Sequence, residues 1–191
     1  MLPYYPTVNQ IFGIFSYIFI RYLDSSEQDG QKDLKMMQDL LKCADQLEAN
    51  IEDAQARTTL FQVGLEAHQV SQKIYGNLNG LADTLSYQCS LPRGTATSAV
   101  FFAWANAQIP SCTAKMSLFA KTLFGIEASD QTQAAEQVMQ SLMELVQKMN
   151  MAVCIPDTGL VLKKHDLKAL AADHDQYEVL KKANKPVQKS K

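Results

Sequence analysis

The chain has 191 residues, of which 47% are hydrophobic and 20% are charged, and these proportions predict a globular protein with a sizeable core. Its 18 Lys and Arg residues nearly balance 20 Asp and Glu residues, so no overall positive field attracts nucleic acid. The basic residues also form no stripe with interleaved aromatic residues, and we therefore expect no nucleic-acid partner.

The first apolar segment is IFGIFSYIFI, residues 11–20, in which eight residues are large and apolar or aromatic. It could pass for the hydrophobic part of a signal peptide. However, no Lys or Arg precedes it, no small-residue cleavage site follows it, and Arg21 ends it short of a membrane span. We predict a buried helix here, and we expect no membrane partner.

Three later segments have apolar residues at helical steps of three and four, namely residues 31–48, 53–74 and 133–149. The second is expected to begin near Asp53, and Ser129 or Asp130 is a candidate cap for the third. A helix containing the only Trp is predicted to stop before Pro110, and a further helix to end at Gly125.

The C-terminal part contains a predicted turn, CIPDTG at residues 154–159, and two short helices after it. The fold prediction is therefore an all-α bundle of seven to nine helices. We expect one helical domain over residues 1–180. Residues 181–191 contain five lysines, and we expect them to form a basic, flexible, solvated tail.

The cysteines and histidines show no ligand spacing for a metal. The four cysteines lie more than 20 residues apart, so no CxxC pair is present, and free thiols in a reducing cytoplasm are expected. The three histidines are scattered, and we expect structural or surface roles for them. These residues are Cys43, Cys89, Cys112 and Cys154, and His68, His165 and His174.

Five stretches resemble, in order, the C-terminal helical domain of the iron-containing alcohol dehydrogenases. Together they cover nearly the whole chain, and no one of them is specific alone. The resemblance implies the dehydroquinate-synthase-like all-α fold of that domain. The five stretches are LPYYPT with RYLD, EDAQARTTLFQVGLEA, NGLADTLSYQCSLPRGTATSAVFF, KMSLFAKTLFG and CIPDTGLVLKKHDLKALAAD.

The resemblance also implies where a metal would be bound. The family uses iron or zinc, held by a D-x3-H pair on the first helix, the first His of H-G-x-A-H and the His of P-H-G. A gapless alignment of the first helix puts Gly13 and Tyr17 at the first pair, and an alternative register puts Asn9 and Gly13 there. The two later positions hold Asn79 and Arg93.

The second His of H-G-x-A-H, which lies near the substrate in the family, is replaced by Asp83. A residual pocket of Tyr17, Asn79, Asp83 and Arg93 is therefore predicted, in which Asp83 and Arg93 could pair. Because a guanidinium has no lone pair to donate, we expect no metal at these degenerate positions.

The family's nucleotide-binding half has no counterpart in this sequence, since no G-x-G-x-x-G and no alternation of strands and helices occurs. We therefore expect no NAD(P) cofactor and no catalytic residues. Three readings remain open. In the first, the chain is a non-catalytic binding or structural module that self-associates. In the second, it is the helical subunit of a split or truncated NAD(P)-dependent alcohol dehydrogenase with a separate nucleotide-binding chain. In the third, it is an unrelated helical bundle, which would scatter the pocket residues.

Overall fold

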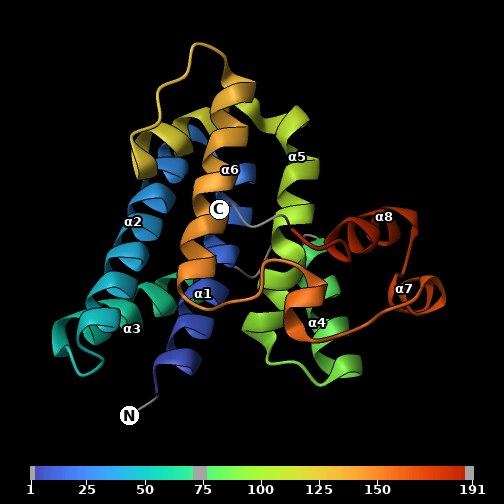
Figure 1. The fold of residues 1–191 in the computed structure, drawn as a ribbon. Coiled ribbons are helices and arrows are strands. Elements are labelled where there is room, and N and C mark those ends of the chain that lie inside the picture. Colours follow the sequence, from blue (N-terminus) through green and yellow to red (C-terminus); the bar gives the residue numbers. More distant parts are fainter. Residues whose placement is uncertain (1–2, 71–76, 188–191) are drawn as a thin grey trace.

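The computed structural model describes residues 3–70 and 77–187, and within these ranges every regular element is helical (Figure 1). This confirms the all-α prediction. Across the same ranges, no helix is both long and apolar enough to cross a membrane. The elements are α1 Tyr4–Asp24, α2 Glu27–Ala49, α3 Ala54–Val70, α4 Asn77–Cys89, α5 Arg93–Phe124, α6 Gln131–Lys148, the 3-10 helix η2 Ile155–Thr158, α7 Lys164–Leu170 and α8 His174–Ala183.

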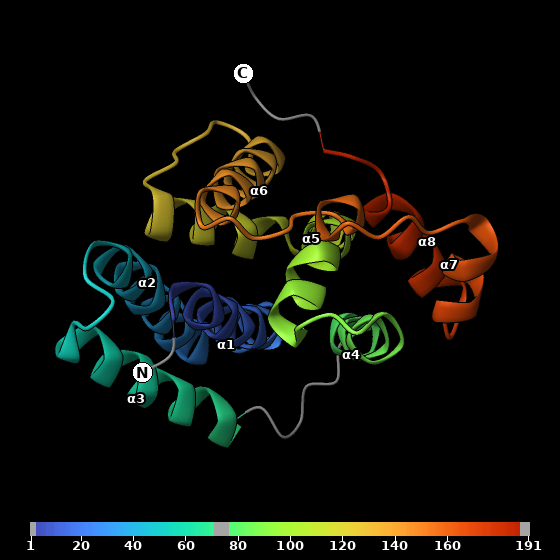
Figure 2. The ribbon, with the colours of Figure 1, turned by 60° about the horizontal axis from the view of Figure 1, so that its bottom comes forward.

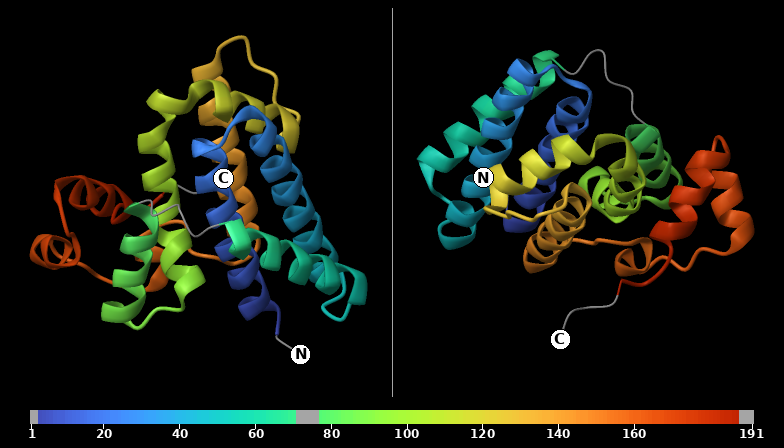
Figure 3. Two further views of the ribbon diagram at one scale, coloured as in Figure 1. Left: turned by 180° about the vertical axis from the view of Figure 1, so that it is seen from behind. Right: turned by 90° about the horizontal axis from the view of Figure 1, so that it is seen from above.

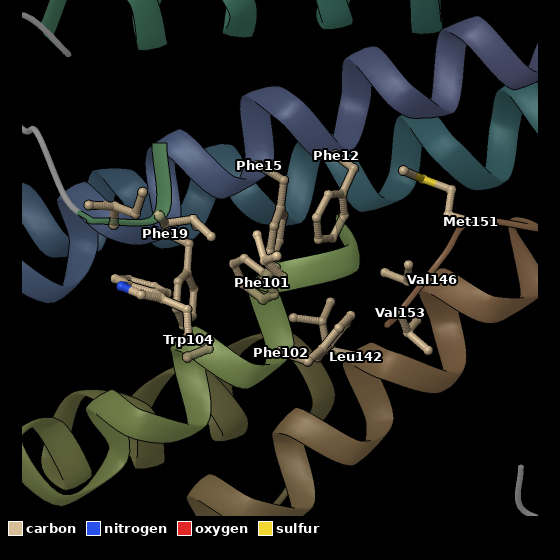
Figure 4. Packing of buried hydrophobic residues seen from close by; sticks show 14 of the residues in the cluster. Phe12, Phe15, Phe19, Phe101, Phe102, Trp104, Leu142, Val146, Met151 and Val153 are labelled. Atoms are coloured by element: carbon tan, nitrogen blue, oxygen red, sulfur yellow. The ribbon is translucent and has the colours of Figure 1, made fainter. Parts of the chain in front are cut away.

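The apolar segment 11–20 is the centre of the bundle. It forms the middle of α1, which lies between α2 and α3 on one side and α5 on the other (Figure 2). Phe19 and Phe101 are fully buried, and their ring centroids lie 5.2 Å apart in an edge-to-face arrangement. Phe12 and Phe15 continue this aromatic row along α1 toward α5 (Figure 4). The prediction of a buried helix is confirmed.

Several helix ends follow the predicted signals. The Asp53 carboxylate accepts a hydrogen bond from the Ala56 amide at 2.9 Å, and Asp130 caps α6 by accepting one from the Gln133 amide at 3.2 Å. Gly125 ends α5 in the left-handed conformation, with φ of 65°. The predicted end of the second segment at residue 74 lies outside the described residues.

The predicted start of α2 at residue 31 was wrong. The helix begins at Glu27, where the Ser26 side chain accepts a hydrogen bond from the Asp29 amide. Its first turn is polar and contains Gly30, so it adds nothing to the apolar periodicity from which the start was predicted.

The predicted separation at Pro110 is a bend inside α5, seen near the top of the left view of Figure 3. Cys112 has non-helical backbone angles, φ −139° and ψ 28°, at this bend. Helical backbone angles continue through Pro110, so the break follows the proline by two residues. Proline has no N–H and its ring crowds the preceding turn, so it disfavours a straight helix. The two predicted helices therefore meet without a loop between them.

The C-terminal segment follows the prediction of a turn and two short helices, which are η2, α7 and α8. Helix α8 includes Lys181 and Lys182 and ends at the buried residue Ala183, so it continues past the expected domain limit at residue 180. Val187 packs partly buried against the core. Residues 188–191 of the predicted tail lie outside the described residues.

Candidate functional site

Tyr17 of α1, Asp83 of α4 and Arg93 of α5 lie together and form what we call the Arg93 cluster. Arg93 Nε donates a hydrogen bond to Asp83 Oδ1 at 2.7 Å. The guanidinium carbon of Arg93 also lies 5.2 Å from the centroid of the Tyr17 ring, within the range of a cation–π contact. One side chain thus connects α1 to the consecutive helices α4 and α5, which come much later in the sequence.

The turn between α4 and α5 places Arg93 beside Asp83. Helix α4 ends at Cys89, and α5 begins at Arg93 directly after Pro92, so only a short connection separates the two helices. The Ser86 hydroxyl donates to the Leu91 carbonyl at 2.8 Å and fixes this connection against α4. A connection of this length makes neighbouring helices antiparallel, which brings the start of α5 back along α4.

A glycine lets the first turn of α5 touch α1. A Cβ atom on Gly94 would lie 2.5 Å from the Asn9 carbonyl oxygen, too close for any other residue at this position. Beside it, Thr95 Oγ1 donates to Asn9 Oδ1 at 2.9 Å and lies 3.0 Å from the Tyr5 hydroxyl. Because this contact fixes α1 against α5, Tyr17, two helical turns beyond Asn9, reaches Arg93.

The other two predicted site residues lie one helical turn before members of the cluster. Gly13 precedes Tyr17 on the same face of α1, and no atom lies within 4 Å of the place its Cβ would occupy. Asn79 precedes Asp83 on α4, is only 8% exposed, and its Oδ1 accepts no hydrogen bond in the described part of the chain. The cluster is therefore bordered by open space on α1 and by an unsatisfied amide on α4.

The ion pair of the cluster is open to solvent. The Arg93 side chain is 37% exposed and the Asp83 side chain 61% exposed, so water and salt screen the attraction between them. A pair of this kind contributes at most about 1 kcal/mol to folding. The ion pair matters more for the chemistry of the site than for stability, since it holds a permanent positive charge over Tyr17.

The remaining candidate groups lie elsewhere. His68, His165 and His174 are exposed, and His165 Nε2 lies 3.1 Å from Asp166 Oδ1. No group of three or more His, Cys, Asp or Glu side chains that could hold a metal ion occurs in residues 3–70 and 77–187.

The four cysteines are free thiols. Burial raises the pKa of every one of these thiols above its ordinary value, so none is an activated nucleophile at neutral pH.

The sequence analysis missed a buried ion pair near the end of α1. Arg21 Nε donates to Asp33 Oδ1 at 2.8 Å, and the same oxygen accepts a second hydrogen bond from Nη2. Arg21 ends a long apolar run, and an arginine there requires a partner if it is buried. The sequence does not reveal which of the acidic residues of α2 that partner is.

Residues 24–189 match a sequence profile described as the Fe-containing alcohol dehydrogenase family, C-terminal. The chain belongs to the iron-containing alcohol dehydrogenase family. This confirms the resemblance and excludes the reading of an unrelated helical bundle. No curated protein sequence matches the chain.

Solved structures of the family show the same fold. NADH-dependent butanol dehydrogenase A from Thermotoga maritima superposes with a TM-score of 0.85 at 20% identity, covering 97% of this chain and 54% of that one. The aldehyde reductase YqhD from E. coli gives 0.83 at 13% identity, with 96% and 54% covered. Alcohol dehydrogenase from Oenococcus oeni gives 0.83 at 15% identity, with 95% and 52% covered. The chain thus spans about half the length of these neighbours.

Proposed function

We propose that this chain is a non-catalytic binding or structural module of the cytoplasm, built on the family's helical domain without the family's metal centre. The observation that carries the proposal is the position of Arg93. The P-x-G turn, at which the family resemblance expects a histidine ligand, here supplies a guanidinium that is bound to Asp83 and lies over Tyr17.

The residues at the four expected ligand positions do not fit an iron or zinc ion. Such an ion needs several N, O or S donors that converge on it. Gly13 has no side-chain donor, and Arg93 has no lone pair and carries a positive charge that repels a cation. The unpaired Oδ1 of Asn79 and the Tyr17 hydroxyl are the remaining donors, and two neutral oxygens are a poor set for either metal.

The contact between Arg93 and Tyr17 supports one of the two registers for the first helix. In the gapless register, Tyr17 stands at the expected histidine position and must therefore face the P-x-G turn, which agrees with the 5.2 Å approach of Arg93 to its ring. In the alternative register, the pair is Asn9 and Gly13. Asn9 also lies beside this turn, at Gly94 and Thr95, but Gly13 would then stand at the expected histidine position and has no side chain to face the turn.

Two measurements on one sample of the purified chain test the proposal. Elemental analysis for iron, zinc and nickel should find no stoichiometric metal, and calorimetric titration with NADH and NADPH should give no binding heat. Stoichiometric metal would contradict the proposal. Binding of either nucleotide without metal would favour the alternative reading, a helical subunit of a split alcohol dehydrogenase that acts with a separate nucleotide-binding chain.

A further inference from the structure

A groove of about 560 Å³ runs between α5 and α6, on a part of the bundle that includes no member of the Arg93 cluster. Five residues of α5, from Phe102 to Thr113, and five of α6, from Thr132 to Met143, line it. Figure 1 shows that α6 runs back alongside the first part of α5 and that α5 bends away at its upper end. The groove volume falls in the range of about 300–1,000 Å³ typical of small-molecule sites.

The floor of the groove is apolar at the end away from the bend. Phe102 and Met139 are 4% and 3% exposed, and Met143 lies beside them on the next turn of α6. Phe102 extends from α5 into the space between the two helices (Figure 4). This end can bury the apolar chain of a ligand, at about 0.8 kcal/mol for each methylene group.

The end near the bend offers hydrogen-bond acceptors. Pro110 has no N–H, so the Asn106 carbonyl lacks the helical donor that position 110 would otherwise supply. Thr113 and Thr132 line the groove at this end. Since the two helices are antiparallel, the last lining residue of α5 lies at the same end of the groove as the first lining residue of α6.

Glu136 is the one charged residue among the described residues that line the groove. It is exposed and forms no ion pair within the described ranges. Among the described residues, no Lys, Arg or His lines the groove to neutralise it. The groove therefore has one apolar end, one end rich in acceptors and a single unpaired negative charge.

We propose that this groove binds a small organic ammonium ion with an apolar chain. The ammonium group donates to the Glu136 carboxylate, and the chain lies over Phe102 and Met139. The charge complementarity selects the occupant, because a carboxylate ligand is repelled by Glu136 and an alcohol gains no attraction from its charge. The inference does not depend on the proposed function, since the groove and the Arg93 cluster share no residue.

Calorimetry with three probes of equal chain length tests the inference, namely n-octylammonium, octan-1-ol and octanoate. Octylammonium should bind saturably at one site, octanol about tenfold more weakly, and octanoate not at all. In Glu136→Gln, octylammonium should lose about tenfold or more in affinity while octanol keeps its own. Glu48→Gln, which removes an exposed carboxylate from α2, is the matched control and should bind like the unchanged protein.

Backbone amide NMR shifts locate the bound probe. Octylammonium should shift the signals of Thr113 and Thr132 and leave those of Asp83 and Gly94 in place. The inference is overturned if octylammonium does not saturate, or if octanol or octanoate binds as tightly. It is also overturned if Glu48→Gln weakens binding as much as Glu136→Gln, or if the shifts appear outside the groove.

Discussion

Two arginine–aspartate pairs that join helices in the described part of the chain differ in burial. Arg21 and Asp33, which connect α1 to α2, are 8% and 2% exposed. The side chains of Arg93 and Asp83, which connect α5 to α4, are 37% and 61% exposed. The same two residue types therefore make a structural contact in the first region and a replaceable surface contact in the second.

The physical difference lies in what remains when one partner is removed. In the buried pair, the group that remains is a lone charge that water cannot reach. Asp33 Oδ2 already accepts no hydrogen bond in the described part of the chain. In the exposed pair, water solvates whichever group is left. A site built from exposed groups can thus change its chemistry without unfolding the domain, and the following predictions test this contrast.

The largest effect is expected for Asp33→Ala. Loss of the carboxylate leaves the Arg21 guanidinium buried and unpaired, which should lower the free energy of unfolding by about 3–5 kcal/mol. Urea denaturation followed by circular dichroism measures this loss. Asp39→Ala, which removes a partly exposed partner of Lys35 from the same helix, should cost only about 0.5 kcal/mol. Equal losses in the two variants would contradict the importance of burial.

An intermediate effect is expected for Lys115→Met. The Lys115 ammonium donates to the carbonyls of Tyr22, Leu23 and Ser25, at 2.8, 2.7 and 2.6 Å, and so satisfies the C-terminal end of α1. Its removal should cost about 1–3 kcal/mol in thermal or urea unfolding. Lys121→Met is the control, because that exposed lysine pairs with the exposed Glu127. A similar cost there would refute the capping role.

The smallest effect is expected for Arg93→Gln. Since the pair with Asp83 is exposed, the free energy of unfolding should fall by less than about 1 kcal/mol, and added salt should reduce the difference further. Unfolding curves at low and high salt check both points. A loss as large as that of Asp33→Ala would mean that Arg93 is a structural residue of the core.

The core helix could be predicted from the sequence because IFGIFSYIFI has no polar face and so requires burial on all sides. Asp53, Gly125 and Asp130 marked helix ends for local reasons that act within a few residues. The break predicted before Pro110 falls at Cys112 instead, because the helix passes through the proline and bends just after it.

The candidate site was predictable only in part. Motif spacing brought Asp83 and Arg93 together, because both flank one short turn. The contact with Tyr17 depends on how closely α5 approaches α1 at Gly94, which is a matter of packing between distant helices. The Arg21–Asp33 pair was missed for the same reason.

The central claim is that Gly13, Tyr17, Asn79 and Arg93 stand where the family's metal ligands stand and hold no metal. The most direct test restores those ligands in one variant, Gly13→Asp with Tyr17→His, Asn79→His and Arg93→His. The zinc content of this variant and of the unchanged chain is measured after equilibration with zinc and removal of the excess, with circular dichroism to verify that both are folded. The account predicts about one zinc per folded chain in the variant and none in the unchanged protein. Stoichiometric zinc in the unchanged protein, or a folded variant that binds no more than it, would contradict the account.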